Sequence, residues 1–341
     1  MAITPRRWRP WPETIRFPPL AISSVCVEPG DQTADLIGIF LRSYDTDTIP
    51  AMSPIALYFA SGESLYLGAA LLVLVMGVSP FLKQTWLLRL RNVGIWLALA
   101  MIVMACPPFA LIVDLIFVTA LVLWFIASNR SSGRWLRSQF AATAVLLVLS
   151  LILTAIEFSH RKMPAVVGKP SDHLVVIGDS ISSGIDPRVQ SWPLVLQKAT
   201  GIAVRNLARP GAQSRDGLTM AEKLTAEDHV VLIEIGGNDL LEGVPSEEFG
   251  KALDALLSRV SAPGRIVVMF ELPLLPHKIA YGRIQRGLAA KYGAWLIPKR
   301  FFAEVIGGAN GTSDGLHLSD EGTRRMATLV EHVLSPVLKS E

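Results

Sequence analysis

The stretch His173-Leu-Val-Val-Ile-Gly-Asp-Ser-Ile-Ser-Ser-Gly184 decides the fold of the second half of this 341-residue chain. Its first five residues form a β-branched run typical of a buried strand, and a glycine- and serine-rich turn follows at once. Similar short runs occur at 202–204, 230–235, 265–270 and 294–297. Helical patterns lie among them at 192–200, 246–260, 277–292 and 319–334. Strands alternating with helices predict an α/β domain whose parallel sheet is covered on both faces.

Polar and glycine-rich clusters follow three of these predicted strands. Gly178-Asp-Ser180 comes after the first, Gly211 after the second and Gly236-Gly-Asn-Asp239 after the third. In open parallel sheets, ligands bind outside the carboxyl ends of the strands. The sequence therefore predicts a functional site at this edge.

The residue types in these clusters suit nucleophilic catalysis. Ser180 is a weak nucleophile until a base removes its proton, and His317 in Asp314-Gly-Leu-His317 is the candidate base. Asp314 can accept a hydrogen bond from the other imidazole nitrogen and stabilise the imidazolium. Backbone N–H groups of Ser180 and Gly211, with the side-chain amide of Asn238, can stabilise an oxyanion.

Each cluster taken alone has an ordinary structural explanation. Gly-Asp-Ser is more often a turn than a nucleophile, Gly-Gly-Asn-Asp is a common turn after a strand, and Asp-Gly-Leu-His can be a loop with a surface histidine. Their joint order within about 170 residues favours a serine hydrolase. The chain lacks G-x-S-x-G at this serine and contains no phosphate-binding glycine motif or clustered Cys/His set, so no metal or cofactor is expected.

Taken together, the motifs resemble those of the SGNH (GDSL) hydrolase family, in its arylesterase and lysophospholipase branch. The resemblance covers about residues 172–338 and includes Ser191-Trp-Pro-Leu and Asp314-Gly-Leu-His-Leu-Ser; Ile181 replaces the usual leucine. It implies a three-layer α/β/α domain that hydrolyses carboxylic esters without a cofactor. It also implies site roles: Ser180, Asp314 and His317 as the triad, and Gly211 and Asn238 as oxyanion donors.

The composition indicates a membrane region before this domain. Hydrophobic residues make up 51% of the chain and charged ones 18%, below the roughly 25% typical of soluble domains. This excludes a disordered chain and disfavours a wholly cytosolic one. A net charge of +3 is too small for a nucleic-acid-binding protein, so no nucleic-acid partner is expected. The apolar excess is concentrated at residues 53–158.

Charged residues delimit about four transmembrane helices. Uncharged runs at 64–82 and 139–156 are each close to the roughly 20 residues that span a bilayer. Between Arg91 and Arg130 lie 38 residues with one charge, Asp114. This stretch would be about 57 Å long as one helix, so we expect a hairpin that turns at Pro107-Pro108. Asp114 then faces interfacial water near a helix start, or lies buried in the bundle as a functional carboxylate.

The distribution of basic residues predicts the topology. The loops 83–91 and 130–137 each carry three Lys or Arg residues and should be cytoplasmic. The turn at Pro107-Pro108 and the part of the chain after Glu157 would then lie outside, although Arg161 and Lys162 weakly favour the reverse.

Four regions follow from this interpretation: an N-terminal arm (1–52), a membrane region (53–158), a linker (159–171) and the SGNH hydrolase domain (172–341). Residues 1–50 hold seven prolines and five arginines and show no helical or strand period. They form a flexible arm, or translation starts at Met52.

The expected protein is a membrane-anchored serine esterase that faces the periplasm or cell exterior and acts on a small-molecule or lipid ester. Two alternatives stay open: an O-acyltransferase or deacetylase acting on an envelope polysaccharide, and a non-catalytic membrane-tethered binding module. The sequence leaves acyl length, leaving group and oligomeric state open.

Overall fold

A computed structural model describes residues 54–82, 84–105, 107–128, 133–185, 188–274 and 278–338. The predicted N-terminal arm lies outside these ranges. The predicted hydrolase domain falls almost entirely within them.

The second half of the chain contains one five-stranded parallel sheet in the order β2-β1-β3-β4-β5. The strands are β1 (His173–Gly178), β2 (Ala203–Asn206), β3 (Val230–Glu234), β4 (Ile266–Phe270) and β5 (Trp295–Ile297). All five predicted strands are confirmed. In β1, β3 and β4 nearly every side chain is buried, as expected of strands covered on both faces.

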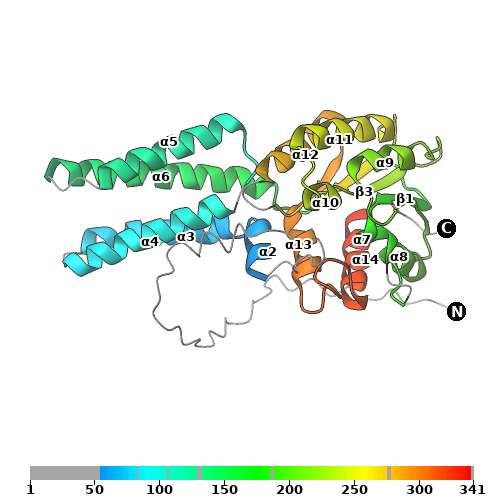
Figure 1. The fold of residues 1–341 in the computed structure, drawn as a ribbon, viewed down its shortest axis with the longest axis horizontal. Coiled ribbons are helices and arrows are strands. Elements are labelled where there is room, and N and C mark those ends of the chain that lie inside the picture. The colour runs from blue at the N-terminus through cyan, green and yellow to red at the C-terminus, as the bar shows by residue number, and fades with distance from the viewer. Residues whose placement is uncertain are drawn as a thin grey trace. The chain divides into compact units, whose positions relative to one another are not determined.

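Two layers of helices cover the sheet (Figure 1). One layer contains α8 (Trp192–Thr200), α13 (Lys299–Gly307) and α14 (Asp320–Leu334); the other contains α9 (Ser214–Ala221), α11 (Ser246–Val260) and α12 (Ile279–Tyr292). Two further short helices, α7 (Ser180–Ser183) and α10 (Gly237–Leu241), begin just after β1 and β3. The α/β/α architecture is as predicted, but the sequence analysis did not predict helices α9 and α13.

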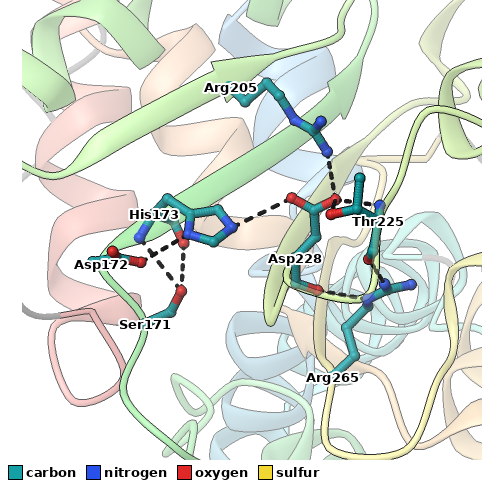
Figure 2. Close-up of polar contacts among 7 residues, drawn as sticks. All are labelled: Ser171, Asp172, His173, Arg205, Thr225, Asp228 and Arg265. Atoms are coloured by element: carbon teal, nitrogen blue, oxygen red, sulfur yellow. Dashed lines mark hydrogen bonds and ion pairs between the residues drawn. The ribbon is translucent and has the colours of Figure 1, made fainter.

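A polar network fastens the amino-terminal edge of the sheet (Figure 2). His173, the first residue of β1, contacts Asp172 through Nδ1 (2.8 Å) and Asp228 through Nε2 (3.3 Å). Asp228 is 4% exposed at its side chain; it also pairs with Arg205 and accepts the Thr225 N–H at 2.6 Å. The buried carboxylate therefore ties the starts of β1 and β2 to the turn before β3.

Four apolar helices precede the sheet: α3 (Ser64–Val78), α4 (Thr85–Met104), α5 (Leu111–Ser128) and α6 (Gly133–Ser159). α3 packs on α4 and α6, and α5 packs on α6. The chain leaves helical structure at Pro107 and Pro108 between α4 and α5, as the predicted hairpin requires. A short helix before them, α2 (Pro54–Ala60), was not predicted.

Only two of these helices, within the described ranges, contain a stretch long and apolar enough to cross a membrane. They are Thr85–Met104 and Ala141–Ser159, and most of each stretch is not buried within the chain. The apolar stretches Ser64–Val78 and Leu111–Ile126 are shorter. The two long helices weakly indicate a membrane region, and the predicted number of four crossings is not confirmed.

Asp114 differs from both sequence-based interpretations. It lies in the first turn of α5, as expected of a carboxylate near a helix start, but its side chain forms an ion pair with Arg283 of α12. The partner is 169 residues away in the sequence.

Candidate active site

Ser180 lies at the tip of a tight turn between β1 and α7. Asp179 caps α7, because its Oδ1 accepts the Ile181 N–H at 2.9 Å. Gly184 then ends the short helix at φ +74°, a conformation that favours glycine. Ser180 is 9% exposed, so the turn holds its hydroxyl at the rim of the sheet, close to the surface.

A pair of buried carboxyl groups, Asp179 and Glu234, lies between this turn and the end of β3. The side chains of Asp179 and Glu234 lie within hydrogen-bonding reach of each other, and both residues are at most 3% exposed. Glu234 also accepts a hydrogen bond from Ser182 Oγ at 2.8 Å, and Ser182 Oγ accepts one from Trp192 Nε1 at 3.1 Å. The turn is therefore anchored to the end of β3 and to α8.

Ionising both carboxyl groups at once costs free energy, because they are buried and their negative charges repel each other. Burial raises the pKa of Asp179 to about 6, although the Ile181 N–H, Glu234 and the His317 charge act in the opposite direction. Burial, followed by the charge of Asp179, raises the pKa of Glu234 well above its ordinary value. The pair therefore retains a proton near neutral pH, which lets one carboxyl group donate to the other.

This shared proton predicts a pH dependence of stability. Above about pH 4.5 the unfolded chain releases a Glu234 proton that the native state still holds, so the free energy of unfolding falls as the pH rises through the native pKa. The slope is at most about 1.4 kcal/mol per pH unit for one proton. Glu234→Gln keeps a donor toward Asp179 and cannot ionise, so it should reduce this slope to the part that Asp179 contributes.

Denaturant unfolding of the detergent-solubilised protein between pH 5 and pH 8 measures the effect. The matched control is Glu248→Gln, since Glu248 is exposed on α11. The control should follow the wild-type slope. Equal slopes in Glu234→Gln and wild type would contradict a shared proton.

Gly211 and Asn238 are brought together at the same edge of the sheet. Asn238 lies in α10 directly after β3, and its Nδ2 donates to the carbonyl oxygen of Ala212 at 3.0 Å. An amide nitrogen carries two hydrogens, so a second donor is left for a ligand. Gly211 adopts φ +73°, and a Cβ there would meet no atom within 4 Å, so its backbone faces open space.

Asp239, next to Asn238, has a structural contact. It accepts hydrogen bonds from the Ser214 N–H (2.9 Å) and Ser214 Oγ (3.2 Å) at the start of α9. These bonds hold the loop of Gly211 against α10.

Asp314 and His317 form a close pair in the loop before α14. Asp314 Oδ2 lies 2.6 Å from His317 Nδ1, and Asp314 Oδ1 accepts the N–H groups of Leu316 and His317. Burial of Asp314 acts to raise its pKa, but these hydrogen bonds outweigh it and lower the pKa to about 2. Asp314 is therefore ionised at neutral pH and fixes the imidazole with Nε2 as its remaining basic atom.

The loops that carry these residues converge at the carboxyl end of the sheet. The charge of His317 acts on Asp179, which directly precedes Ser180. A Cβ added at Gly237, next to Asn238, would lie 3.3 Å from Asp179 Oδ2. Among the sequence-predicted residues, short polar contacts join Asp314 with His317 and Asn238 with the Gly211 loop. The Asp179–Glu234 pair was not foreseen, because an acidic residue ending an apolar strand carries no distinctive pattern.

Other parts of the described chain fit a ligand less well. An open hollow of about 510 Å³ lies beside His173, Arg205 and Asp228, at the amino ends of the strands. Its charged groups mainly pair with one another, as Figure 2 shows. In the part of the chain that the structure describes, no group of three or more His, Cys, Asp or Glu side chains could hold a metal ion.

Comparisons with known proteins bear on the same half of the chain. The model of the GDSL-like lipase/acylhydrolase family matches residues 176–325. Esterase TesA of Pseudomonas aeruginosa is 32% identical over 181 residues, which cover 48% of this chain and 89% of TesA. An arylesterase of Vibrio mimicus is 31% identical over 127 residues, covering 35% of this chain and 62% of that protein.

Two further similarities extend the pattern. The thioesterase 1/protease 1/lysophospholipase L1 of Escherichia coli is 27% identical over 40% of this chain and 69% of its own length. The crystal structure of TesA matches with a TM-score of 0.43 and covers 49% of this chain and 99% of its own. The sequence match to TesA, 32% identical and covering 89% of that esterase, shows that the chain belongs to the GDSL-like lipase/acylhydrolase family and is an ester-hydrolysing enzyme.

Proposed function

We propose that the chain is a membrane-anchored serine esterase with Ser180, His317 and Asp314 as its catalytic triad. The observation that carries this proposal is the ionised Asp314 bound to His317 Nδ1 at 2.6 Å, which leaves Nε2 as the base. The Ser180 turn at the end of β1 supplies the nucleophile. The similarity of the second half of the chain to known esterases supports the assignment of a serine esterase.

The reaction proceeds in two halves. Ser180 Oγ attacks the carbonyl carbon of the ester while its proton passes to His317 Nε2, and Asp314 stabilises the imidazolium that forms. The imidazolium then protonates the leaving alcohol, and the C–O bond breaks to leave an acyl group on Ser180. Water, deprotonated by His317, attacks the acyl-enzyme and releases a carboxylic acid and free Ser180.

The oxyanion formed in each half needs donors that are already in place. Backbone N–H groups of Ser180 and Gly211 supply two, and the second Nδ2 hydrogen of Asn238 supplies the third. The hydrogen bond from Asn238 to Ala212 supports this role, because it orients the amide before substrate arrives.

Asn238→Ala is therefore expected to lower kcat on a methylumbelliferyl ester by about 10²–10³-fold, the usual loss for one oxyanion donor. KM should change little, since the interaction forms with the charged intermediate. A near-normal kcat would remove Asn238 from the oxyanion hole.

Covalent capture tests the proposed function directly. A fluorophosphonate is expected to attach to Ser180 Oγ, and peptide mass spectrometry of the labelled protein identifies the site. Labelling elsewhere, or none in a protein that hydrolyses esters, would contradict the triad. Product analysis with and without a sugar acceptor separates hydrolysis from acyl transfer.

The same proposal includes the membrane region and the domain boundaries. Residues 53–158 form the membrane region, and all four helices α3–α6 cross the bilayer. The shorter helices α3 and α5 support this, because they pack alongside the long helices α4 and α6. Residues 159–171 link this region to the hydrolase domain at 172–341, which faces the periplasm or cell exterior. The substrate is a small-molecule or lipid ester.

A further inference from the structure

Three of the apolar helices carry a carboxylate at or next to one of their ends. Each of these carboxylates pairs with an arginine that lies outside the helices. Glu63 precedes α3, Asp114 lies in the first turn of α5 and Glu157 in the last turns of α6. Their partners come from the linker and from α12 and α13. We call this set of ion pairs the helix-end dock: Glu63, Asp114 and Glu157 with Arg161, Arg283, Arg286 and Arg300.

The centre of the helix-end dock is a buried triad of charges. The Arg286 guanidinium donates to both carboxylate oxygens of Glu157 at 2.7 Å and to Glu271 Oε1 at 2.7 Å. The side chains of Arg286, Glu157 and Glu271 are 10%, 7% and 1% exposed. Separating α6 from α12 is costly while water is excluded, because Glu157 would lose both hydrogen bonds to Arg286 and stay charged. The triad therefore fixes α6 against the hydrolase domain.

Flanking contacts restrain the remaining helix ends. Arg283 pairs with Asp114 and also donates to the Phe109 carbonyl at 2.6 Å. Arg161 forms a two-pronged contact with Glu63 at 2.8 and 3.1 Å. Lys299 Nζ lies 3.4 Å from the carbonyl oxygen of Ala105, the residue that caps α4. All four helices thus meet the domain at the same end.

Two of these contacts arise at the carboxyl edge of the sheet. Glu271 directly follows β4, and Lys299 comes two residues after β5. The strands are parallel, so this is also the edge that carries Ser180 after β1 and Asn238 after β3. β1 lies two strands from β4, on the order of 10 Å along the edge. The helix-end dock therefore contacts the sheet at the carboxyl ends of β4 and β5, on the side that also carries Ser180.

Two exposed apolar side chains lie close in the sequence to the proposed site residues. In the described part of residues 172–338, the exposed large hydrophobic residues are Ile185, Leu194 and Leu241. Ile185 lies five residues after Ser180, and Leu241 lies three after Asn238. Two of the three are therefore within five residues of a proposed site residue in the sequence.

We propose that the helix-end dock holds the active site facing the lipid surface, so that the enzyme draws amphiphilic carboxylic esters from the bilayer in which its own helices sit. This inference rests on the proposed function, since it requires α3–α6 to lie in a membrane and Ser180 to be the nucleophile. The ion pairs set the orientation, and Ile185 and Leu241 meet the acyl chain or the lipid surface as the ester enters.

The test uses the full chain reconstituted in vesicles of phosphatidylcholine and phosphatidylglycerol. The bilayer-resident probe is methylumbelliferyl oleate, placed in the same vesicles as the enzyme or in separate vesicles. The soluble probe is methylumbelliferyl acetate. Wild-type protein is expected to hydrolyse the oleate at least about tenfold faster from its own vesicles, and the acetate equally in both arrangements.

Opening the helix-end dock should remove this advantage. Arg286→Met removes the arginine from Glu157 and, within the described chain, leaves Glu271 with only the Lys299 N–H, so both carboxylates gain solvation when the domain separates from the helices. The linker still tethers the domain, but the catalytic edge then faces the membrane only part of the time. Same-vesicle oleate turnover should fall about tenfold, while acetate turnover stays within about two-fold and reports that the domain remains folded.

Matched variants keep the result interpretable. Arg324→Met removes an arginine from an exposed ion pair with Glu321 on α14 and should leave both activities unchanged. Arg283→Asp and Asp114→Arg should each lower same-vesicle oleate turnover, and the double reversal should restore it.

Two outcomes contradict different proposals. If wild type hydrolyses acetate but does not favour oleate from its own vesicles, or if Arg286→Met and Arg283→Asp keep that preference, the orienting role is wrong. If wild type hydrolyses neither the acetate nor the oleate, the proposed serine esterase is wrong.

Discussion

Ser180→Ala should abolish ester hydrolysis, lowering kcat on methylumbelliferyl acetate by a factor on the order of 10⁶, the loss that follows removal of a serine nucleophile. Without Oγ no acyl-enzyme can form, and the oxyanion donors alone support only residual catalysis. Stopped and continuous assays of the solubilised full chain, with fluorophosphonate labelling in parallel, measure both losses. Turnover within tenfold of wild type would exclude Ser180 as the nucleophile.

The substitution should leave the fold intact, which makes the result specific to chemistry. Ser180 is only 9% exposed, but removing Oγ leaves no large cavity, and α7 is capped by Asp179 rather than by Ser180. Ser183→Ala is the matched control, since Ser183 lies in the same short helix and its Oγ donates to the neighbouring Gly184 carbonyl at 3.3 Å. It should retain near-normal turnover.

Asp314→Asn should lower kcat by about 10⁴-fold, because an amide can present a donor to Nδ1 and favour the wrong tautomer of His317. The native carboxylate accepts from His317 Nδ1 and from two backbone N–H groups, and an asparagine oxygen can still satisfy the backbone. The loop should therefore keep its shape while the base is lost.

The pH dependence of kcat/KM distinguishes this effect from misfolding. Wild-type Asp314, with its pKa lowered to about 2, stays ionised at all working pH values, so its stabilising hydrogen bonds are lost only as the pH falls from about 3.8 toward 2. In Asp314→Asn, activity should rise with pH as hydroxide replaces the lost base, while denaturant unfolding at pH 7 should stay cooperative and show a folded protein. A loss below tenfold would assign Asp314 a structural role only.

Local sequence patterns predicted the strands and long helices because each carries its own signal. β1 and β3 are continuous β-branched runs, and α11 has an apolar stripe with acidic residues in its first turn. The missed α9 and α13 contain only 8 and 9 residues. α9 begins with a Gln213–Asp216 capping box, which a search for serine or threonine caps overlooks.

The candidate site residues were predictable from the sequence where they lie within short local motifs. Gly-Asp-Ser, Gly-Gly-Asn-Asp and Asp-Gly-Leu-His are each short and local, so their residues could be named before their positions in space were known. The buried partners could not be named. Glu234 supports the Ser180 turn from 52 residues beyond Ser182, and nothing in the intervening chain marks that contact.

The sequence by itself determined that an apolar helical region precedes an α/β ester-hydrolysing domain, and which residues of that domain are candidates for chemistry. The tertiary structure alone decided the partners of the isolated charges. Asp114 with Arg283, and Glu157 with Arg286, are 169 and 129 residues apart. Hydrophobic periodicity acts over a few residues and is visible in the sequence, whereas an ion pair depends on which surfaces folding brings together.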